Sequence, residues 1–211
     1  MSSASISQQP TLYVIAGPNG SGKSTFTLAF SSQSALPVID PDAVARILRP
    51  DAPEAAMIEA GRLVIERAQD LLRQSLSFAI ETTLSGHTQL RLMREAKGKQ
   101  YRVEFIYVCV ASPDINISRV AQRVAQGGHH VPAADVRRRY QRSLDNLLIA
   151  IQIADFSVLY DNSNKEGHRK VIEIAYGQVT FQDTSLPQWV TNNIGALLTP
   201  PPSPPTPPTT P

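Results

Sequence analysis

The chain has 211 residues, of which 42% are apolar and 18% charged, and its formal net charge at pH 7 is +2. This composition is ordinary for a globular protein, and so small a net charge argues neither for nor against a polyanionic partner. A nucleic-acid partner is not expected. The single cysteine, Cys109, excludes an internal disulfide and is expected to be a buried core thiol. No segment reaches the roughly 18 apolar residues of a membrane span, and residues 1–7 lack the basic start and apolar stretch of a signal peptide. We therefore expect a cytoplasmic protein without membrane association.

Short apolar runs alternate along the chain with stretches of helical periodicity. The predicted strands cover residues 12–16, 37–39, 77–80, 101–110 and 156–160, followed by a hairpin at 171–175 and 178–181. The predicted helices cover residues 25–30, a segment beginning at Pro41, and residues 53–74, 87–97, 115–125, 133–153 and 185–198. Almost continuously apolar strands that alternate with helices predict a parallel sheet covered on both faces.

The expected fold class is α/β, with three layers. A central, mostly parallel sheet of five strands would carry helices on both faces, a helical lid and a small C-terminal hairpin. We expect one domain over residues 11–198, preceded by a flexible N-terminus at residues 1–10. Residues 199–211 contain only Pro, Thr and Ser, so a disordered or polyproline II tail is expected there.

One motif dominates the N-terminal part of the chain. Residues 17–24 read GPNGSGKS and match the phosphate-binding pattern G-x-x-x-x-G-K-[ST] at every fixed position. A strand precedes the motif and a helix follows it, so backbone N–H groups and a helix N-terminus can surround an anion. The expected cofactors are ATP and Mg²⁺, with Lys23 on the outer phosphates and Ser24 on the metal. The predicted nucleotide-binding residues are Gly17, Pro18, Asn19, Gly20, Ser21, Gly22, Lys23, Ser24 and Thr25.

Two common classes of phosphate-loop protein lack support in the sequence. The best match to the guanine-binding pattern N-K-x-D is at residues 164–167, where glycine replaces the aspartate. Residues 84–88 begin like the ABC-transporter signature but directly follow a predicted strand close to the phosphate loop. These departures favour a small kinase over a GTPase or an ABC-type ATPase. We therefore expect the fold of P-loop NTPases, with a kinase-like domain over residues 11–198.

Acidic residues follow the second and third predicted strands. Ligands bind at the carboxyl ends of strands in open parallel sheets, which places Asp40, Asp42 and Glu81 near the nucleotide. Asp42 is the candidate general base for the acceptor hydroxyl. Asp40 is expected to cap a helix or to support the metal. Glu81 is a candidate substrate ligand, with a structural ion pair to a lysine as the alternative.

Arginines concentrate in two predicted helices that flank a break containing Gly127, Gly128, His129 and His130. Helix, break and helix is the layout of a lid that brings guanidinium groups onto a transferring phosphoryl group. A solvated basic helix face is the alternative. Residues 137–139 sweep roughly 200° of helix, so they cannot all face one site. The arginines of this segment are Arg119, Arg123, Arg137, Arg138, Arg139 and Arg142.

Five segments resemble the zeta toxin family and follow one another in the order found in that family. They are the phosphate loop, the D-P-D turn at 40–42, E-T-T-L-S at 81–85, the strand at 101–108 and the segment 119–140. The likeness covers about residues 11–165 and is nearest to the short bacterial branch described as "predicted ABC-type ATPase". The resemblance implies a kinase that phosphorylates the 3′-hydroxyl of the amino sugar in UDP-N-acetylglucosamine. It also implies a possible antitoxin partner. The implied roles are Asp42 as general base, Glu81 and Thr83 as sugar contacts, and Arg123 as the first lid arginine.

The sequence departs from the family at the second lid arginine, where His129 or His130 stands before Pro132. His129 is therefore taken as a substrate-binding candidate, and Arg138, from the cluster 137–139, as the second catalytic arginine. Asp40, beside the candidate base, is a further substrate-binding candidate. The chain is also shorter than the characterised toxins. Two alternatives stay open: a kinase for another acceptor, such as a drug, a free sugar or a polynucleotide end, and a nucleotide-binding regulatory module with little turnover.

Overall fold

The structure, a computed structural model, describes residues 9–128 and 130–198. The predicted tail at 199–211 and His129 lie outside the described residues, as does most of the predicted N-terminal lead-in. The strands are β1 (Thr11–Ala16), β2 (Val38–Ile39), β3 (Phe78–Thr82), β4 (Arg102–Cys109), β5 (Phe156–Asp161), β6 (Arg169–Ala175) and β7 (Gln178–Gln182). The helices are α1 (Lys23–Gln33), α2 (Pro41–Leu48), the 3₁₀ turn η1 (Pro53–Ala56), α3 (Met57–Arg73), α4 (Thr88–Gly98), α5 (Pro113–Ala125), α6 (Ala133–Asp145), α7 (Leu147–Ile153) and α8 (Gln188–Leu198).

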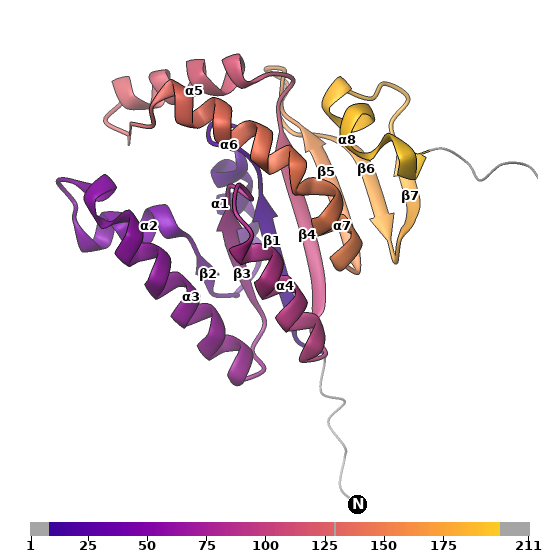
Figure 1. The fold of residues 1–211 in the computed structure, drawn as a ribbon, viewed down its shortest axis with the longest axis horizontal. Helices are drawn as coiled ribbons and strands as arrows, with labels where there is room; N and C mark the ends of the chain where they lie inside the picture. Colours follow the sequence, from indigo (N-terminus) through magenta and orange to yellow (C-terminus); the bar gives the residue numbers. More distant parts are fainter. Residues whose placement is uncertain (1–8, 129, 199–211) are drawn as a thin grey trace, which may run out of the picture.

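The strands form one seven-stranded sheet in the order β2-β3-β1-β4-β5-β6-β7. The first five are parallel, and β6 and β7 extend the sheet as an antiparallel hairpin. Helix α1 lies behind the sheet, α4, α6 and α7 lie in front, and α5 crosses above the carboxyl ends of the parallel strands (Figure 1). The expected α/β fold with helices on both faces is confirmed.

The core explains why the strands are apolar almost throughout. Side chains of β1, β3 and β4 are covered on both faces, and the largest fully buried ones include Phe78, Phe105 and Tyr107, with Tyr101 directly before β4. Full burial of one such side chain contributes roughly 1.5–3 kcal/mol, so the central strands hold the sheet rigid beneath its carboxyl edge. That edge carries the phosphate loop.

The structure corrects three details of the expected fold. The C-terminal hairpin joins the central sheet through β5, so the sheet has seven strands rather than five. Strand β3 continues to Thr82, which puts Glu81 inside the strand rather than after it. The helix expected over 133–153 divides at Asn146, whose buried side chain donates to the Leu84 carbonyl at 2.9 Å. Within the described residues, no helix combines the length and apolar character needed to span a bilayer.

Candidate nucleotide-binding and catalytic site

The loop between β1 and α1 requires glycine at positions where the backbone is left-handed. Gly20 has φ +75° and Gly22 has φ +96°. A Cβ at Gly22 would lie 2.2 Å from Asn162 Nδ2, and one at Gly20 would lie 2.7 Å from the Asn116 carbonyl oxygen. Both the conformation and the close neighbours therefore exclude a side chain, as a phosphate-binding loop needs.

Three side chains outside the motif hold the loop by its carbonyl groups. Asn116 Nδ2 donates to Asn19 O at 2.5 Å, and Asn162 Nδ2 donates to Ser21 O at 2.8 Å. His168 Nε2 lies 3.1 Å from Gly22 O. In a trans peptide, the N–H points opposite to its C=O. These contacts therefore direct the N–H groups of residues 20, 22 and 23 to the other side of the loop.

The N-terminus of α1 is open to an anion. Among the described residues, no side chain caps this helix and its first turn carries no acid. The buried Ser21 hydroxyl also has no hydrogen-bond partner in the described part of the chain. Free donors at a helix N-terminus fit a phosphate group. The loop therefore fits the phosphates of a nucleotide. Thr25 is exposed, and within the described part of the chain no contact assigns it a role.

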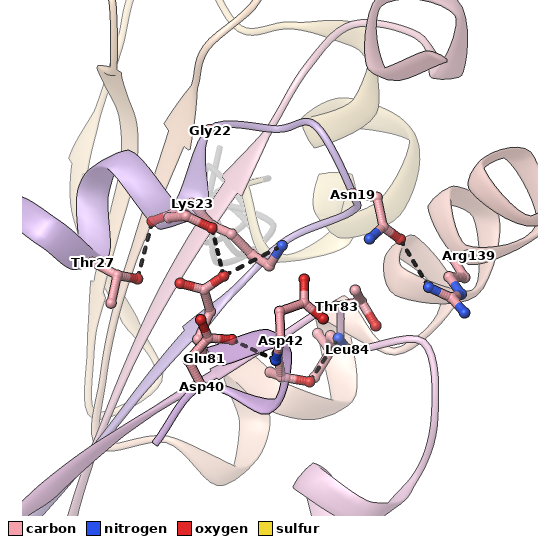
Figure 2. Close-up of polar contacts among 12 residues, drawn as sticks. Asn19, Gly22, Lys23, Thr27, Asp40, Asp42, Glu81, Thr83, Leu84 and Arg139 are labelled. Carbon is pink, nitrogen blue, oxygen red and sulfur yellow. Dashed lines mark hydrogen bonds and ion pairs between the residues drawn. The ribbon is translucent and has the colours of Figure 1, made fainter. Parts of the chain in front are cut away.

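Lys23, Ser24 and Glu81 converge at the base of the loop. Ser24 Oγ donates to Glu81 Oε1 at 2.8 Å, and Lys23 Nζ lies 3.6 Å from the same oxygen (Figure 2). Glu81 is buried at the end of β3, the strand beside β1. A hydroxyl and a carboxylate in this arrangement fit Mg²⁺, which takes few protein oxygens and completes its shell with phosphates and water. Glu81 thus makes the lysine ion pair expected as its alternative role.

The turn after β2 presents two aspartates with different environments. Asp40 Oδ1 accepts from the Asp42 N–H at 2.9 Å and so caps α2, as expected. Burial raises the pKa of the Asp40 carboxyl above its ordinary value of 3.8, and the charges of Glu81 and Asp42 raise it further. Asp42, on the first turn of α2, is only half-buried and lines the pocket in front of Lys23.

One pocket of about 240 Å³ brings together Lys23, Asp40, Asp42, Glu81 and Thr83 of the predicted site. Helix α6 contributes Arg139, whose guanidinium donates to Asn19 Oδ1 at 3.3 Å. Figure 2 shows the Asp42 carboxylate and the Lys23 ammonium on the same side of the loop. The residues that line this pocket include Asn19, Lys23, Asp40, Asp42, Glu81, Thr83, Ser85, Gln89 and Arg139.

The other predicted lid residues are placed differently. Arg123 lines a neighbouring pocket of about 340 Å³, which it shares with Asp42 and His130. Arg138 pairs with Asp135 at 2.9 Å and is exposed, so the structure places Arg139 rather than Arg138 at the pocket with Lys23. The substrate-binding role given to His129 concerns a residue outside the described part of the chain.

Cys109 is buried in the core cluster, as expected. Burial raises the pKa of its thiol to about 12. A thiol with that pKa stays protonated at neutral pH and is a poor nucleophile, so Cys109 belongs to the core rather than to the site.

Sequence reasoning missed Asn116, Asn162 and His168. Asn162 directly follows β5 at the carboxyl edge of the sheet, so the strand-end rule that selected Glu81 could also have selected it. Asn116 lies inside a helix and His168 in a loop, and no motif marks either residue. Arg139 was one of three candidate arginines at 137–139. Only the orientation of the helix determines which of the three faces the site.

Comparison with known proteins agrees with this geometry. The family described as "AAA domain" matches residues 12–147. An uncharacterised protein of Haemophilus influenzae is 36% identical over 124 residues, which cover 59% of this chain and 88% of the relative.

Two solved structures share the fold. The AvrRxo1-ORF1:ORF2 complex with ATP aligns at 17% identity with a TM-score of 0.64, over 82% of this chain and 61% of that chain. This chain therefore spans about three fifths of the AvrRxo1 chain it matches. The PezAT toxin–antitoxin system of Streptococcus pneumoniae aligns at 18% identity with a TM-score of 0.62, over 89% of this chain and 79% of that chain. Together with the phosphate loop and the sheet order, the family match over residues 12–147 establishes that the chain belongs to the AAA domain family, with a P-loop kinase-like fold.

Proposed function

We propose that the protein is a kinase that transfers the γ-phosphoryl group of ATP to a hydroxyl group of a small molecule. The observation that carries the proposal is the shared pocket in which Asp42 faces the Lys23 end of the phosphate loop. A protein that only binds nucleotide has no need of a carboxylate there. A kinase needs one, because the acceptor hydroxyl must lose its proton as the phosphoryl group arrives.

Each side chain of the site has a separate role in phosphoryl transfer. The N–H groups of the loop and Lys23 bind the phosphates, and Ser24 with Glu81 would hold Mg²⁺, whose charge helps neutralise the β- and γ-phosphates. The acceptor oxygen attacks the γ-phosphorus, its proton passes to the Asp42 carboxylate, and the bond between the γ-phosphorus and the bridging oxygen breaks to leave ADP. Arg139 lies at the rim of the pocket, where a guanidinium can stabilise charge on the transferring group.

UDP-N-acetylglucosamine is the first acceptor to test. Two observations support it: the motifs that resemble the zeta toxin family, and the fold shared with a chain of the PezAT toxin–antitoxin system. In this proposal Thr83, at the rim of the pocket, contacts the sugar. The same likeness makes a protein partner of the antitoxin type part of the proposal, which co-expression with a neighbouring open reading frame would test.

The decisive variant is Asp42→Asn. With ATP, Mg²⁺ and UDP-N-acetylglucosamine, the wild type should form a phosphosugar, and the variant should lose about 10²–10⁴-fold in kcat because the base is gone. Asp70→Asn, on the far part of α3, is the matched control and should leave kcat unchanged. A wild type that binds ATP and phosphorylates no acceptor in a broad screen would contradict the proposal. Product from a different acceptor would retain the kinase and replace the sugar nucleotide.

A further inference from the structure

One half of the sheet is left open on its rear face. Helices α4, α6 and α7 lie in front of the sheet, and α1 lies behind it (Figure 1). Within the described residues, α1 is the helix that packs on the rear face, and it does so over β1 and β3. The rear face of β4–β7 therefore has no helix of its own in the described part of the chain, although parallel strands such as β4 and β5 are normally covered on both faces.

The alternation of side chains along β5 puts two aromatic rings on this rear face. Leu159 belongs to the main core cluster in front of the sheet, so Phe156 and Tyr160, each an odd number of residues away, point to the rear. The ring of Tyr160 contacts the ring of Phe26 on α1, with centroids 5.2 Å apart, which agrees with the position of α1 behind the sheet. Phe156 and Tyr160 are both half-buried.

The C-terminal hairpin extends the same face to the edge of the sheet. Val158 of β5 pairs with Glu173 of β6, and Glu173 pairs with Phe181 of β7. Paired residues of neighbouring strands share a face, so Phe181 also points to the rear, where it is 38% exposed. Strand β7 is the last strand of the sheet. The aromatic surface therefore begins at an open edge.

The six phenylalanines of the chain divide between two environments. Phe78 and Phe105 are fully buried in the core. The other four lie on the rear face of the sheet or on α1 behind it, and all four remain partly accessible to solvent. Several aromatic side chains gathered on one accessible face indicate a surface that another segment or molecule covers. These four residues are Phe26, Phe30, Phe156 and Phe181.

The charges on this face are paired with one another. Arg102 Nε lies 3.0 Å from Glu104 Oε1, and Lys170 Nζ lies 2.8 Å from Glu173 Oε2. Lys170 Nζ also lies 4.5 Å from the centroid of the Phe181 ring. An occupant without charged side chains fits such a surface better than a basic or acidic one, because it leaves these pairs intact.

The segment that follows α8 has the composition and the length to cover this face. Residues 199–211 contain only Pro, Thr and Ser, and proline-rich segments bind aromatic surfaces as polyproline II with little loss of conformational entropy. Helix α8 ends at Leu198, and Leu197 lines a hollow beside Tyr176 and Gly177 of the β6–β7 turn, so the segment begins near the open edge. At about 3.1 Å per residue it spans roughly 40 Å, whereas the four strand spacings from β7 to β1 amount to roughly 19 Å.

We propose that residues 199–211 bind across the rear face of β5–β7 and against the side of α1 that carries Phe26. The prolines pack on the rings of Phe156, Tyr160 and Phe181, and the segment covers the part of the rear face that α1 leaves open. The ligand of this face is thus an uncharged proline-rich segment, which the chain itself supplies. The inference is independent of the proposed kinase function, because it concerns a face away from the phosphate loop and the acceptor.

A spin label on the segment reports where it binds. In the full chain, Ser203→Cys provides the attachment point, and the buried Cys109 should stay unlabelled, which treatment of the wild type checks. We expect the nitroxide to reduce the amide signals of Phe26 and Phe30 on α1 at least twofold relative to the chemically reduced label. The signals of Lys97 and Ile153, which line the hollow beside Leu197, should change less.

Two variants test whether aromatic rings and prolines cause this proximity. Phe181→Ser removes the ring at the open edge and should restore at least half of the lost α1 signal. Tyr176→Ser is the matched control, because it removes an exposed ring on the β6–β7 turn that lines the hollow beside Leu197, and it should leave the attenuation unchanged. Replacement of the prolines in residues 200–208 by glycine alters no residue of the folded elements and should abolish the attenuation.

Three results would overturn the proposal. Attenuation centred on Lys97 and Ile153 would place the segment in the hollow beside Leu197 instead. Equal attenuation of α1 in the chain with glycine at 200–208 would show that the face does not recognise proline. A mixture of ¹⁵N-labelled chain with spin-labelled, unenriched chain reports contacts between copies, and the full attenuation of α1 in that mixture would assign the face to a second copy of the chain.

Discussion

The phosphate loop is held by side chains that its motif does not include. Asn116, Asn162 and His168 come from α5 and from the segment after β5, and each contacts a carbonyl oxygen of the loop. Such contacts fix peptide orientation before the nucleotide arrives, so less conformational entropy is lost on binding. We therefore expect the affinity for a nucleotide to depend on residues almost a hundred positions or more away from the loop in sequence.

Asn162→Ala should therefore weaken ATP binding. Removal of the amide leaves the half-buried Ser21 carbonyl without this donor, and the loss of a typical hydrogen bond costs roughly 0.5–1.5 kcal/mol. Because the loop is less well ordered for binding, we expect the ATP dissociation constant to rise about tenfold, with little change in the KM of the acceptor. Calorimetric titration with ATP measures this dissociation constant. Asn164→Ala, at an exposed neighbour of the same type, is the control. Equal ATP affinities in the two variants would show that the contact of Asn162 with the Ser21 carbonyl does not support nucleotide binding.

Asp40 makes the stability of the protein depend on pH. Burial raises the pKa of its carboxyl above the ordinary 3.8, so the folded state disfavours the ionised form that the unfolded state accepts. The free-energy cost of ionising Asp40 in the folded protein is absent at a pH below the ordinary pKa of the carboxyl and complete at a pH above its raised pKa. The unfolding free energy contributed by this group therefore falls as the pH rises through that window.

Asp40→Asn removes the ionisation but keeps a good helix cap. We expect the variant to gain thermal stability over the wild type at pH 7, and to gain less at pH 4. Paired melting curves at the two pH values measure the difference. A gain that is the same at both pH values would show that the Asp40 charge is not its source.

At the scale of the element, the orientation of α6 selects one arginine from three. Successive residues on a helix are turned by about 100°, so the three side chains diverge. Arg137 contacts Asp114, Arg138 contacts Asp135, and Arg139 contacts Asn19 of the phosphate loop. Only Arg139 shares a pocket with Lys23.

Arg139→Ala should lower kcat for phosphoryl transfer at least tenfold, because a guanidinium near the transferring group stabilises charge that develops there. Arg138→Ala is the matched control on the same helix and should retain kcat within about twofold. Steady-state kinetics with saturating ATP compare the two. A larger loss in Arg138→Ala than in Arg139→Ala would mean that the lid closes with a different rotation of α6.

The same helix shows where sequence-based prediction ends. Apolar runs predict the parallel strands because burial on both faces demands them, and the glycine pattern of residues 17–24 predicts the phosphate loop. The direction in which Arg139 points depends on how α6 packs, which periodicity alone does not determine. Likewise, nothing in the sequence around residues 171–182 states that the hairpin pairs with β5, because antiparallel pairing depends on tertiary contacts.

At the scale of the whole molecule, the C-terminal part supports the N-terminal loop. The family match ends at residue 147, yet Asn162 and His168 lie beyond it on the segment that joins β5 to β6. That segment is anchored by Asp161, a buried carboxylate at the end of β5. Asp161 accepts hydrogen bonds from Trp189 Nε1 of α8 at 3.0 Å and from Ser163 Oγ at 2.7 Å. Helix α8 thereby reaches the phosphate loop through two intermediate residues.

Trp189→Phe tests this connection. The substitution keeps an aromatic ring against Tyr107 but removes the N–H donor to a buried carboxylate, which should lower the unfolding free energy by roughly 1–3 kcal/mol. Urea denaturation measures the loss, and Tyr176→Phe, which removes the hydroxyl of an exposed aromatic ring on the β6–β7 turn, should stay within about 0.5 kcal/mol of the wild type. Because Asp161 positions the segment that contains Asn162, the Trp189 variant should also bind ATP more weakly under conditions in which it is fully folded. A variant that loses stability but keeps the wild-type affinity for ATP would show that Trp189 stabilises the core and that α8 does not influence the nucleotide site.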